Sequence, residues 1–143
     1  LILGPGKMII VKRYLMFILV INMPCWRWHI KNIGLFIPNV LQRRGYAILD
    51  RRYRTRFGEI DIVSEHDGVI VFVEVKARSS NRFGDAADQV PVWKQRRIAA
   101  MALDYLSFTG RLNDTCRFDV VAIDGVGTPA QRMAVIEGAF LAP

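Results

Sequence analysis

The sequence predicts an α/β domain in which helices flank a mixed β-sheet. Two β-branched, strand-like segments joined by a turn signal occupy residues 58–76, a long amphipathic segment occupies residues 89–110, and another strand-like segment lies at residues 117–124. The expected order from residue 39 onwards is one helix, three strands, a second helix and one or two strands. This alternation is typical of layered α/β domains with both parallel and antiparallel neighbours in the sheet.

Length and composition are those of one globular domain. The chain has 143 residues, of which 52% are hydrophobic and 23% charged, so it is long enough for a hydrophobic core and too apolar for a disordered protein. We expect the domain to occupy residues 39–143, because residues 1–38 differ from the rest in composition and begin without Met. That segment need not be native to the domain.

The N-terminal apolar segment does not match a membrane span or a cleaved signal. The uncharged run after Arg13, residues 14–23, is shorter than the roughly 20 residues that cross a bilayer. It is followed by large aromatic residues instead of a small-residue cleavage site. No stable membrane association is expected, and an anchor through residues 8–23 is left open as an alternative.

The first half of the domain contains a helix end and three strands. "NVLQRRGY" predicts a helix closed by Gly45, since glycine suits a C-terminal cap. The strands expected after it are residues 46–54, 58–65 and 69–76. The "HDG" sequence at residues 66–68 is a hairpin signal, so the second and third strands should be antiparallel neighbours.

The second half contains the longest predicted helix, within residues 89–110. Pro91 suits its first turn, and Gly110 is placed to end it. The residues that recur at helical spacing and mark its buried face are Ile98, Ala102 and Tyr105. Further strands are expected at residues 117–124 and 132–140.

The net charge indicates the class of binding partner, and the cysteine content indicates the cellular compartment. The net charge of +7 and the isoelectric point of about 9.9 favour a polyanionic partner, nucleic acid first and an anionic membrane second, with solubility as an equally good reason for the charge. Cys25 and Cys116 are too few and too far apart for a disulfide framework or a zinc site. We therefore expect free thiols and a cytoplasmic protein.

Charged side chains on two neighbouring strands suggest a metal site. Glu74 and Lys76 share one face of the third strand, and Glu59 and Asp61 share one face of the second. Clustered carboxylates repel one another unless a cation compensates them, and Mg²⁺ is commonly bound by one or two carboxylates with water and phosphate. A lysine beside the metal can stabilise negative charge or activate water, so the set suffices for phosphodiester hydrolysis. The alternative is an ordinary salt bridge on a solvated sheet face.

Five segments together resemble one bacterial family in their order and spacing. They are "RRGYAILDRRYRTRFGEIDIV", "VIVFVEVKARS", "FGDAADQVPVWKQRRIAAMALDYL", "RFDVVAI" and "VIEGAF", and they resemble the YraN-type proteins, which are regarded as endonucleases of the PD-(D/E)XK superfamily. The resemblance covers roughly residues 41–140 and extends to archaeal Holliday junction resolvases. It implies a restriction-endonuclease-like fold and an endonuclease that uses Mg²⁺ or Mn²⁺ to cleave DNA, including branched or damaged DNA. A resolvase-like activity would also need two sites, and hence a homodimer.

The resemblance also implies roles for individual residues. Asp61 corresponds to the metal-binding aspartate, Glu74 to the second acidic ligand and Lys76 to the catalytic lysine. Glu59, in "GEID", is a signature residue that would support the metal or a water; its alternative is a solvated carboxylate at a strand end.

Basic and aromatic residues near this set are candidates for nucleic-acid contacts. Lys94 shares a helix face with Ile98, so it can point toward the sheet and reach a substrate phosphate; a solvated lysine is the alternative. The arginines expected to contact the phosphate backbone are Arg54, Arg56, Arg78 and Arg97, each with a solvated surface role as its alternative. The aromatic residues able to stack on bases are Trp93, Tyr46, Phe57 and Phe118, and core packing is the more common role for each.

Two further features bear on the predicted site. Asp119 shares a strand face with Arg117, so we expect it to be a structural acid paired with an arginine, with a metal role as the alternative. Residues 1–49 contain no Asp or Glu, whereas the family begins with a helix whose glutamate helps to build the site in related resolvases. A nucleic-acid-binding module that kept the fold and lost turnover is therefore the alternative function.

Overall fold

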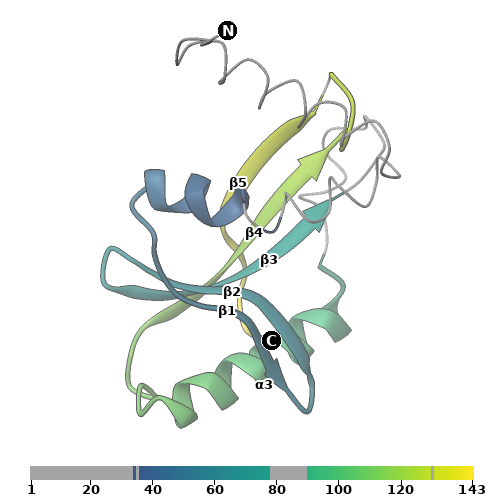
Figure 1. Ribbon diagram of the computed structural model, residues 1–143. Coiled ribbons are helices and arrows are strands. Elements are labelled where there is room, and N and C mark those ends of the chain that lie inside the picture. Colours follow the sequence, from purple (N-terminus) through teal and green to yellow (C-terminus); the bar gives the residue numbers. More distant parts are fainter. Residues whose placement is uncertain (1–33, 35, 78–89, 130) are drawn as a thin grey trace, which may run out of the picture. The chain divides into compact units, whose positions relative to one another are not determined.

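The sheet has five strands in the order β1-β2-β3-β4-β5. In the computed structural model, which describes residues 34, 36–77, 90–129 and 131–143, neighbouring strands are antiparallel except for the parallel pair β3 and β4. The strands are β1 (Ala47–Thr55), β2 (Gly58–His66), β3 (Val69–Ala77), β4 (Cys116–Asp124) and β5 (Arg132–Phe140). The predicted α/β fold with a mixed sheet is thereby confirmed, and its architecture is consistent with a restriction-endonuclease-like domain (Figure 1).

Residues 37–143 form one compact unit. The predictions made for residues 1–33 and for Arg78 lie outside the described residues. Among the helices that the structure describes, none is long and apolar enough to cross a membrane.

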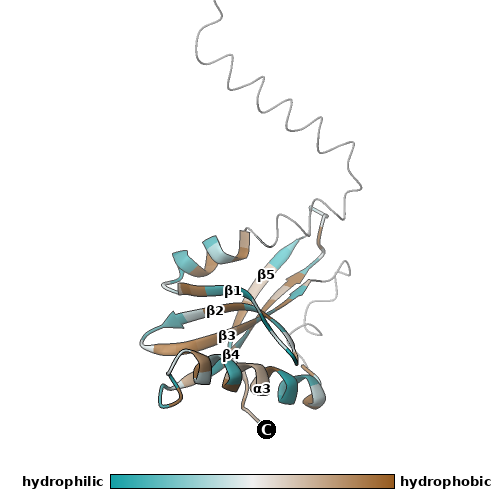
Figure 2. Ribbon diagram, turned by 60° about the horizontal axis from the view of Figure 1, so that its bottom comes forward, coloured by the Kyte–Doolittle hydropathy of each residue, from teal (hydrophilic) through white to brown (hydrophobic). Residues whose placement is uncertain are grey.

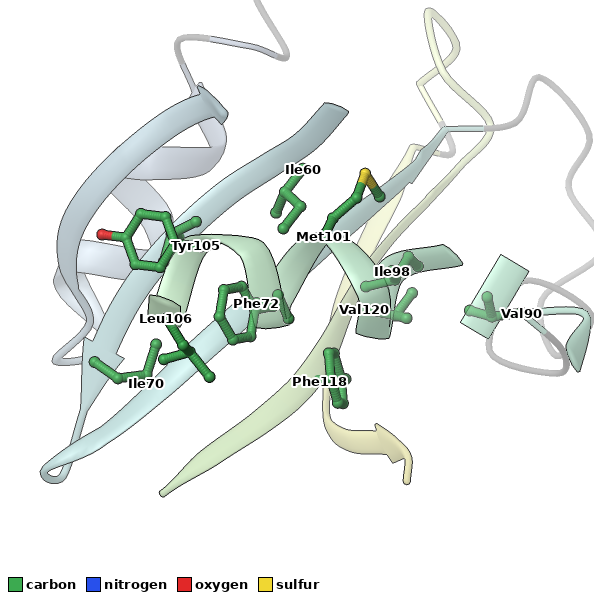
Figure 3. Close-up of a cluster of buried hydrophobic side chains, with 12 residues drawn as sticks. Ile60, Ile70, Phe72, Val90, Ile98, Met101, Tyr105, Leu106, Phe118 and Val120 are labelled. Carbon is green, nitrogen blue, oxygen red and sulfur yellow. The ribbon is translucent and has the colours of Figure 1, made fainter. Parts of the chain in front are cut away.

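Helix α3 (Val92–Phe108) connects β3 to β4 and covers one face of the sheet. Its predicted buried stripe is confirmed, since Ile98, Ala102 and Tyr105 are all buried. Figure 3 shows Ile98 and Tyr105 of this stripe beside Phe72 and other apolar side chains of the sheet. The strand residues of this core are Ile60, Val63, Ile70, Phe72, Phe118 and Val120.

The start of α3 differs slightly from the prediction. Pro91 lies at the N-cap, one residue before the helix, and not in the first turn. Its carbonyl oxygen accepts hydrogen bonds from the backbone N–H groups of Lys94 (2.8 Å) and Gln95 (3.0 Å). The N-cap has extended backbone angles and needs no N–H of its own, so proline fits there as well as one residue later.

A second helix, residues 36–43, ends as predicted at Gly45. Gly45 has a φ of +90° and donates to the carbonyl of Gln42 (3.0 Å), while Tyr46 N–H donates to the carbonyl of Leu41 (3.1 Å). These two bonds form a Schellman motif, which requires the left-handed conformation that glycine adopts without strain. Figure 2 shows this helix and α3 on opposite sides of the sheet.

The predicted hairpin between β2 and β3 is also present. Asp67 and Gly68 both have positive φ, 51° and 75°, as a type I′ turn requires. The turn sets the register, in which His66 pairs with Val69 and Ile62 with Val73. This register brings the acidic end of β2 beside the acidic end of β3.

Candidate active site at the fork between β2 and β3

The neighbouring strands β2 and β3 separate at the site. Their ladder ends at the pair Ile62 and Val73, beyond which β2 continues beside β1 and β3 beside β4. Asp61, the next residue of β2, accepts a hydrogen bond at Oδ2 from the backbone N–H of Val75 (2.8 Å). The carboxylate therefore satisfies a backbone donor that the missing strand pairing leaves open.

A pocket of about 390 Å³ lies beside this fork. Residues of β2, β3 and α3 line it, so it lies between the sheet and the first turns of the helix. The lining residues are Gly58, Glu59, Asp61, Glu74, Val75, Trp93, Lys94, Arg97, Ile98 and Met101. The structure thus brings together three acids and two basic residues that the sequence singled out.

Glu74 is compensated by a lysine from the helix. Lys94 Nζ forms an ion pair with Glu74 Oε1. The side chain of Glu74 is only 12% exposed, and an unpaired carboxylate at that depth would be costly. Lys94 therefore points toward the sheet and is an ion-pair partner of Glu74.

Asp61 has a strongly perturbed acidity. Burial raises its pKa from 3.8 to about 6, and the nearby charge of Glu74 acts in the same direction. The hydrogen bond from Val75 and the charge of Lys94 lower the pKa but do not cancel the effect of burial. A desolvated carboxyl group beside a second acid in a pocket is typical of functional sites.

Glu59 reaches the pocket but is held by arginines of β1. It accepts hydrogen bonds from Arg52 Nε (3.0 Å) and Arg54 Nε (2.9 Å). The bond from Arg54, followed by that from Arg52, lowers the pKa of Glu59. Glu59 is thus an ionised carboxylate that lines the pocket, and it binds two exposed arginines of β1.

Asp61 and Glu74 are the side chains of the pocket that could hold a divalent cation together with water and phosphate. Among the described residues, no group of three or more His, Cys, Asp or Glu side chains could hold a metal ion. Asp61 and Glu74 nevertheless provide two carboxylates, and their described contacts engage Asp61 Oδ2 and Glu74 Oε1. Two carboxylates are the usual protein contribution to a magnesium site at a phosphate.

Comparison with known proteins places the chain in a family. Residues 36–123 match the model of the uncharacterised protein family UPF0102. The chain belongs to the UPF0102 family. The matched region contains β1 to β3, α3, all of β4 except Asp124, and every described residue that lines the pocket, and the match confirms the family resemblance found in the sequence.

Individual UPF0102 proteins are similar to more than half of this chain. A relative from Symbiobacterium thermophilum is 42% identical over 100 residues, which are 70% of this chain and 85% of the relative. One from Ralstonia pickettii is 51% identical, with 59% of this chain and 71% of the relative covered. One from Chlorobium chlorochromatii is 49% identical, with 59% of this chain and 64% of the relative covered.

Other predicted site residues of this UPF0102 chain lie at different distances from the pocket. Lys76 is half-buried and is not among the described residues that line the pocket. Strand alternation predicts the face of the sheet but not how far along the strand a pocket extends, and among the described residues of β3 the lining ends at Val75. Arg56 lies over the ring of Phe57, with 4.7 Å between its guanidinium carbon and the ring centroid. Arg97 lines the pocket and donates from Nε to the carbonyl of Phe57.

Asp119 is a structural acid, as predicted. It is fully buried and accepts hydrogen bonds from Tyr46 Oη (2.9 Å), Arg117 Nε (3.0 Å) and the N–H of Gly138 (2.9 Å). Burial, followed by the bond to Asp119, raises the pKa of Tyr46 to about 12. Tyr46 is buried and stacks on His66 with 4.1 Å between ring centroids, so it is a core residue and not a platform for a base.

Sequence reasoning missed two residues of the helix wall of the pocket and the partner of Glu74. Ile98 and Met101 form part of that wall, and Trp93 lines it although its surface is 63% exposed. The sequence did contain a signal for this pairing. Lys94 lies four residues before the buried Ile98, so it faces the sheet.

Proposed function

We propose that this UPF0102 protein is a metal-dependent endonuclease that hydrolyses phosphodiester bonds in DNA. The proposal is supported above all by the meeting of Asp61 and Glu74 in a pocket that Lys94 and Arg97 also line. Two acids suit a hard divalent cation, and two basic side chains suit a phosphate. The basic composition of the chain, with a net charge of +7, supports a polyanionic substrate.

Each charged residue of the pocket has a separate role in the proposed reaction. Asp61 and Glu74 would hold Mg²⁺ or Mn²⁺, which supplies Lewis-acid polarisation of the phosphate and a more acidic water. Arg97 binds a phosphate oxygen and orients the substrate. Lys94 already lies against Glu74, so its ammonium is within the pocket and is placed to stabilise the negative charge that develops on phosphate. Lys76 is the second candidate for the catalytic lysine.

The wider surface suits the DNA backbone. Arg52 and Arg54 are exposed despite their bonds to Glu59, with 71% and 75% of their side-chain surface accessible. Arginines at such positions provide affinity without sequence specificity. We propose that the protein works in the cytoplasm on branched or damaged DNA, and that a homodimer supplies two sites for a branched substrate.

A nucleic-acid-binding module without turnover is the second candidate. The observation that favours it is the ion pair between Glu74 and Lys94, which can compensate the acid without any metal. The absence of an acidic residue from residues 1–49 points the same way. In this case, the pocket would bind phosphate through Lys94 and Arg97 and would not cleave DNA.

A cleavage assay with isosteric variants decides between the two candidates. Linear, flapped and four-way DNA are incubated with wild-type protein, Asp61→Asn and Glu74→Gln, in Mg²⁺, Mn²⁺ or EDTA. The nuclease proposal expects metal-dependent cleavage that falls by about 100-fold or more in both variants. Asp67→Asn is the matched control, because Asp67 is an exposed turn residue outside the pocket.

All proteins are purified in parallel, so that a contaminating nuclease would be present in every preparation. Equal cleavage by wild-type protein and both pocket variants would identify a contaminating nuclease and contradict the proposal. Tight binding without cleavage in any metal would favour the binding module. Cleavage that Asp67→Asn retains and Asp61→Asn loses supports the nuclease.

A further inference from the structure

We infer that Trp93 stacks on an unpaired base beside the phosphate in the pocket, so that the substrate class is DNA with unpaired nucleotides and not continuous duplex. This inference rests on the proposed function, because it concerns the same pocket. It specifies the substrate that the pocket selects through one exposed aromatic side chain.

The exposure of Trp93 is unusual for its position. The residue lines the pocket that holds Asp61 and Glu74, yet 63% of its surface is accessible. Tryptophan is usually largely buried, because its ring offers a large apolar area. The core beneath α3 is formed by Ile98 and Met101, among other residues, and does not include Trp93. The indole therefore has a free surface beside the acidic site.

The immediate surroundings of the indole are basic. Lys94 is the next residue and Arg97 follows one turn later, and both line the pocket. Arg97 also bonds to the carbonyl of Phe57, so the β1–β2 turn lies against the start of α3. Phe57 of that turn is a second accessible aromatic residue, 36% exposed, and the guanidinium of Arg56 lies over its ring.

Basic groups interspersed with accessible rings are typical of proteins that bind single-stranded nucleic acid. The cations contact successive phosphates, and each ring stacks on a base without reading its sequence. An exposed tryptophan can also anchor a protein partner. The acids and cations of the same pocket favour a nucleic acid, because protein interfaces are depleted of charge at their centres.

An unpaired base is required by the geometry of stacking. In a continuous duplex, the neighbouring base pairs cover both faces of each base, so an indole reaches only the groove edges. A base must leave the stack before its face is available, and this costs least where the base is already unpaired. Flaps and single strands therefore meet the condition that intact duplex does not.

The test measures DNA binding without metal, so it does not depend on turnover. Fluorescence anisotropy in EDTA compares a single strand, a flapped duplex and a blunt duplex of the same sequence. Trp93→Ala is expected to weaken binding of the single strand and the flap by a factor on the order of 10 to 100, as for loss of one stacked base. Trp93→Phe should retain most of the affinity, and blunt duplex should change less than about threefold.

Leu103→Ala is the matched control, because Leu103 is also an exposed apolar residue of α3, at 60%, and does not line the pocket. It should bind all three DNAs as the wild type does. Equal weakening of duplex and single strand in Trp93→Ala, or no weakening of either, overturns the inference; the second result would leave a protein contact as the role of Trp93. Since Trp93 is exposed, its variants should unfold at nearly the wild-type temperature.

Failure of this inference can be told from failure of the nuclease proposal. Metal-dependent cleavage with binding that is indifferent to Trp93 overturns the inference alone. Selective binding that requires Trp93, without cleavage in any metal, overturns the nuclease proposal and supports the stacking role.

Discussion

Lys94 of α3 forms an ion pair with Glu74 of β3, and this contact joins the helix to the acidic end of the sheet. Glu74 is 12% exposed and Lys94 is 34% exposed, so the pair lies at the boundary between the core and the pocket. It supplies the compensation that a buried carboxylate needs. The same contact places a cation beside Asp61, the other acid of the pocket.

Removal of the ammonium should destabilise the protein. Lys94→Met leaves Glu74 buried without its partner, and we expect the free energy of unfolding to fall by about 1–3 kcal/mol, less than for a fully buried pair because Lys94 is partly solvated. Adding Glu74→Gln should restore part of the loss. Urea denaturation in EDTA measures both, with Arg96→Met as a control at an exposed basic position of α3. A loss that the second substitution does not reduce would show that the charge of Glu74 is not its cause.

Asp61 should make stability depend on pH. Its pKa is raised to about 6 in the folded protein, so between about pH 4 and 6 the folded state holds a proton that the unfolded state releases. The free energy of unfolding of the wild type therefore falls as the pH rises through this window. Asp61→Asn cannot ionise but still accepts from Val75, so we expect it to be more stable by about 1–3 kcal/mol at pH 7.5 and nearly equal at pH 4.

The measurement is urea denaturation of both proteins from pH 4 to pH 8 in EDTA. Asp67→Asn serves as the control, because the side chain of Asp67 is 86% exposed, and its stability should follow that of the wild type. A stability difference for Asp61→Asn that stays constant across the window would contradict a raised pKa at Asp61.

Divalent metal should stabilise the wild type through the two acids. A ligand that binds the folded state alone raises the melting temperature by mass action. We expect Mg²⁺ or Mn²⁺ to raise it by a few degrees in the wild type at pH 8, and to have little effect on Asp61→Asn or Glu74→Gln. Thermal unfolding followed by circular dichroism checks this without any assay of activity. A similar rise in all three proteins would place the metal outside the pocket.

The two candidate lysines should differ in their effect on cleavage. Lys94 lines the pocket and Lys76 is not among its described lining residues, so we expect Lys94→Met to lower the single-turnover rate by about 100-fold or more and Lys76→Met by less. Rates are compared per folded molecule, because Lys94→Met is also expected to be less stable. A larger loss of cleavage rate in Lys76→Met than in Lys94→Met would contradict this expectation and identify Lys76 as the catalytic lysine.

Asp119 should matter for stability and not for chemistry. It is fully buried and accepts bonds from Tyr46, Arg117 and Gly138, so Asp119→Asn should lower the free energy of unfolding by about 2–4 kcal/mol. Cleavage per folded molecule, measured well below the melting temperature, should remain at the wild-type rate. Asp114→Asn is the control, as Asp114 belongs to an exposed pair with Arg111, which should contribute little. Loss of cleavage in folded Asp119→Asn would contradict the structural role.

The sequence by itself determined the elements and the two acids. The "HDG" turn joins strands of opposite direction, Gly45 ends a helix, and Ile98, Ala102 and Tyr105 mark one helix face. These features depend on local backbone preference and on the period of hydrophobic residues, which are readable along the chain. The alternation of β2 and β3 likewise indicated that Asp61 and Glu74 lie together.

Only the tertiary structure decided which charges meet and which side chains stay in solvent. The pairing of Glu74 with Lys94, the pKa of Asp61 and the exposure of Trp93 all depend on where α3 lies on the sheet. Lys76 shares a strand face with Glu74 but is not among the residues that line the pocket. Periodicity gives the direction of a side chain from its own element, whereas burial and ion pairing depend on distances between elements far apart in the sequence.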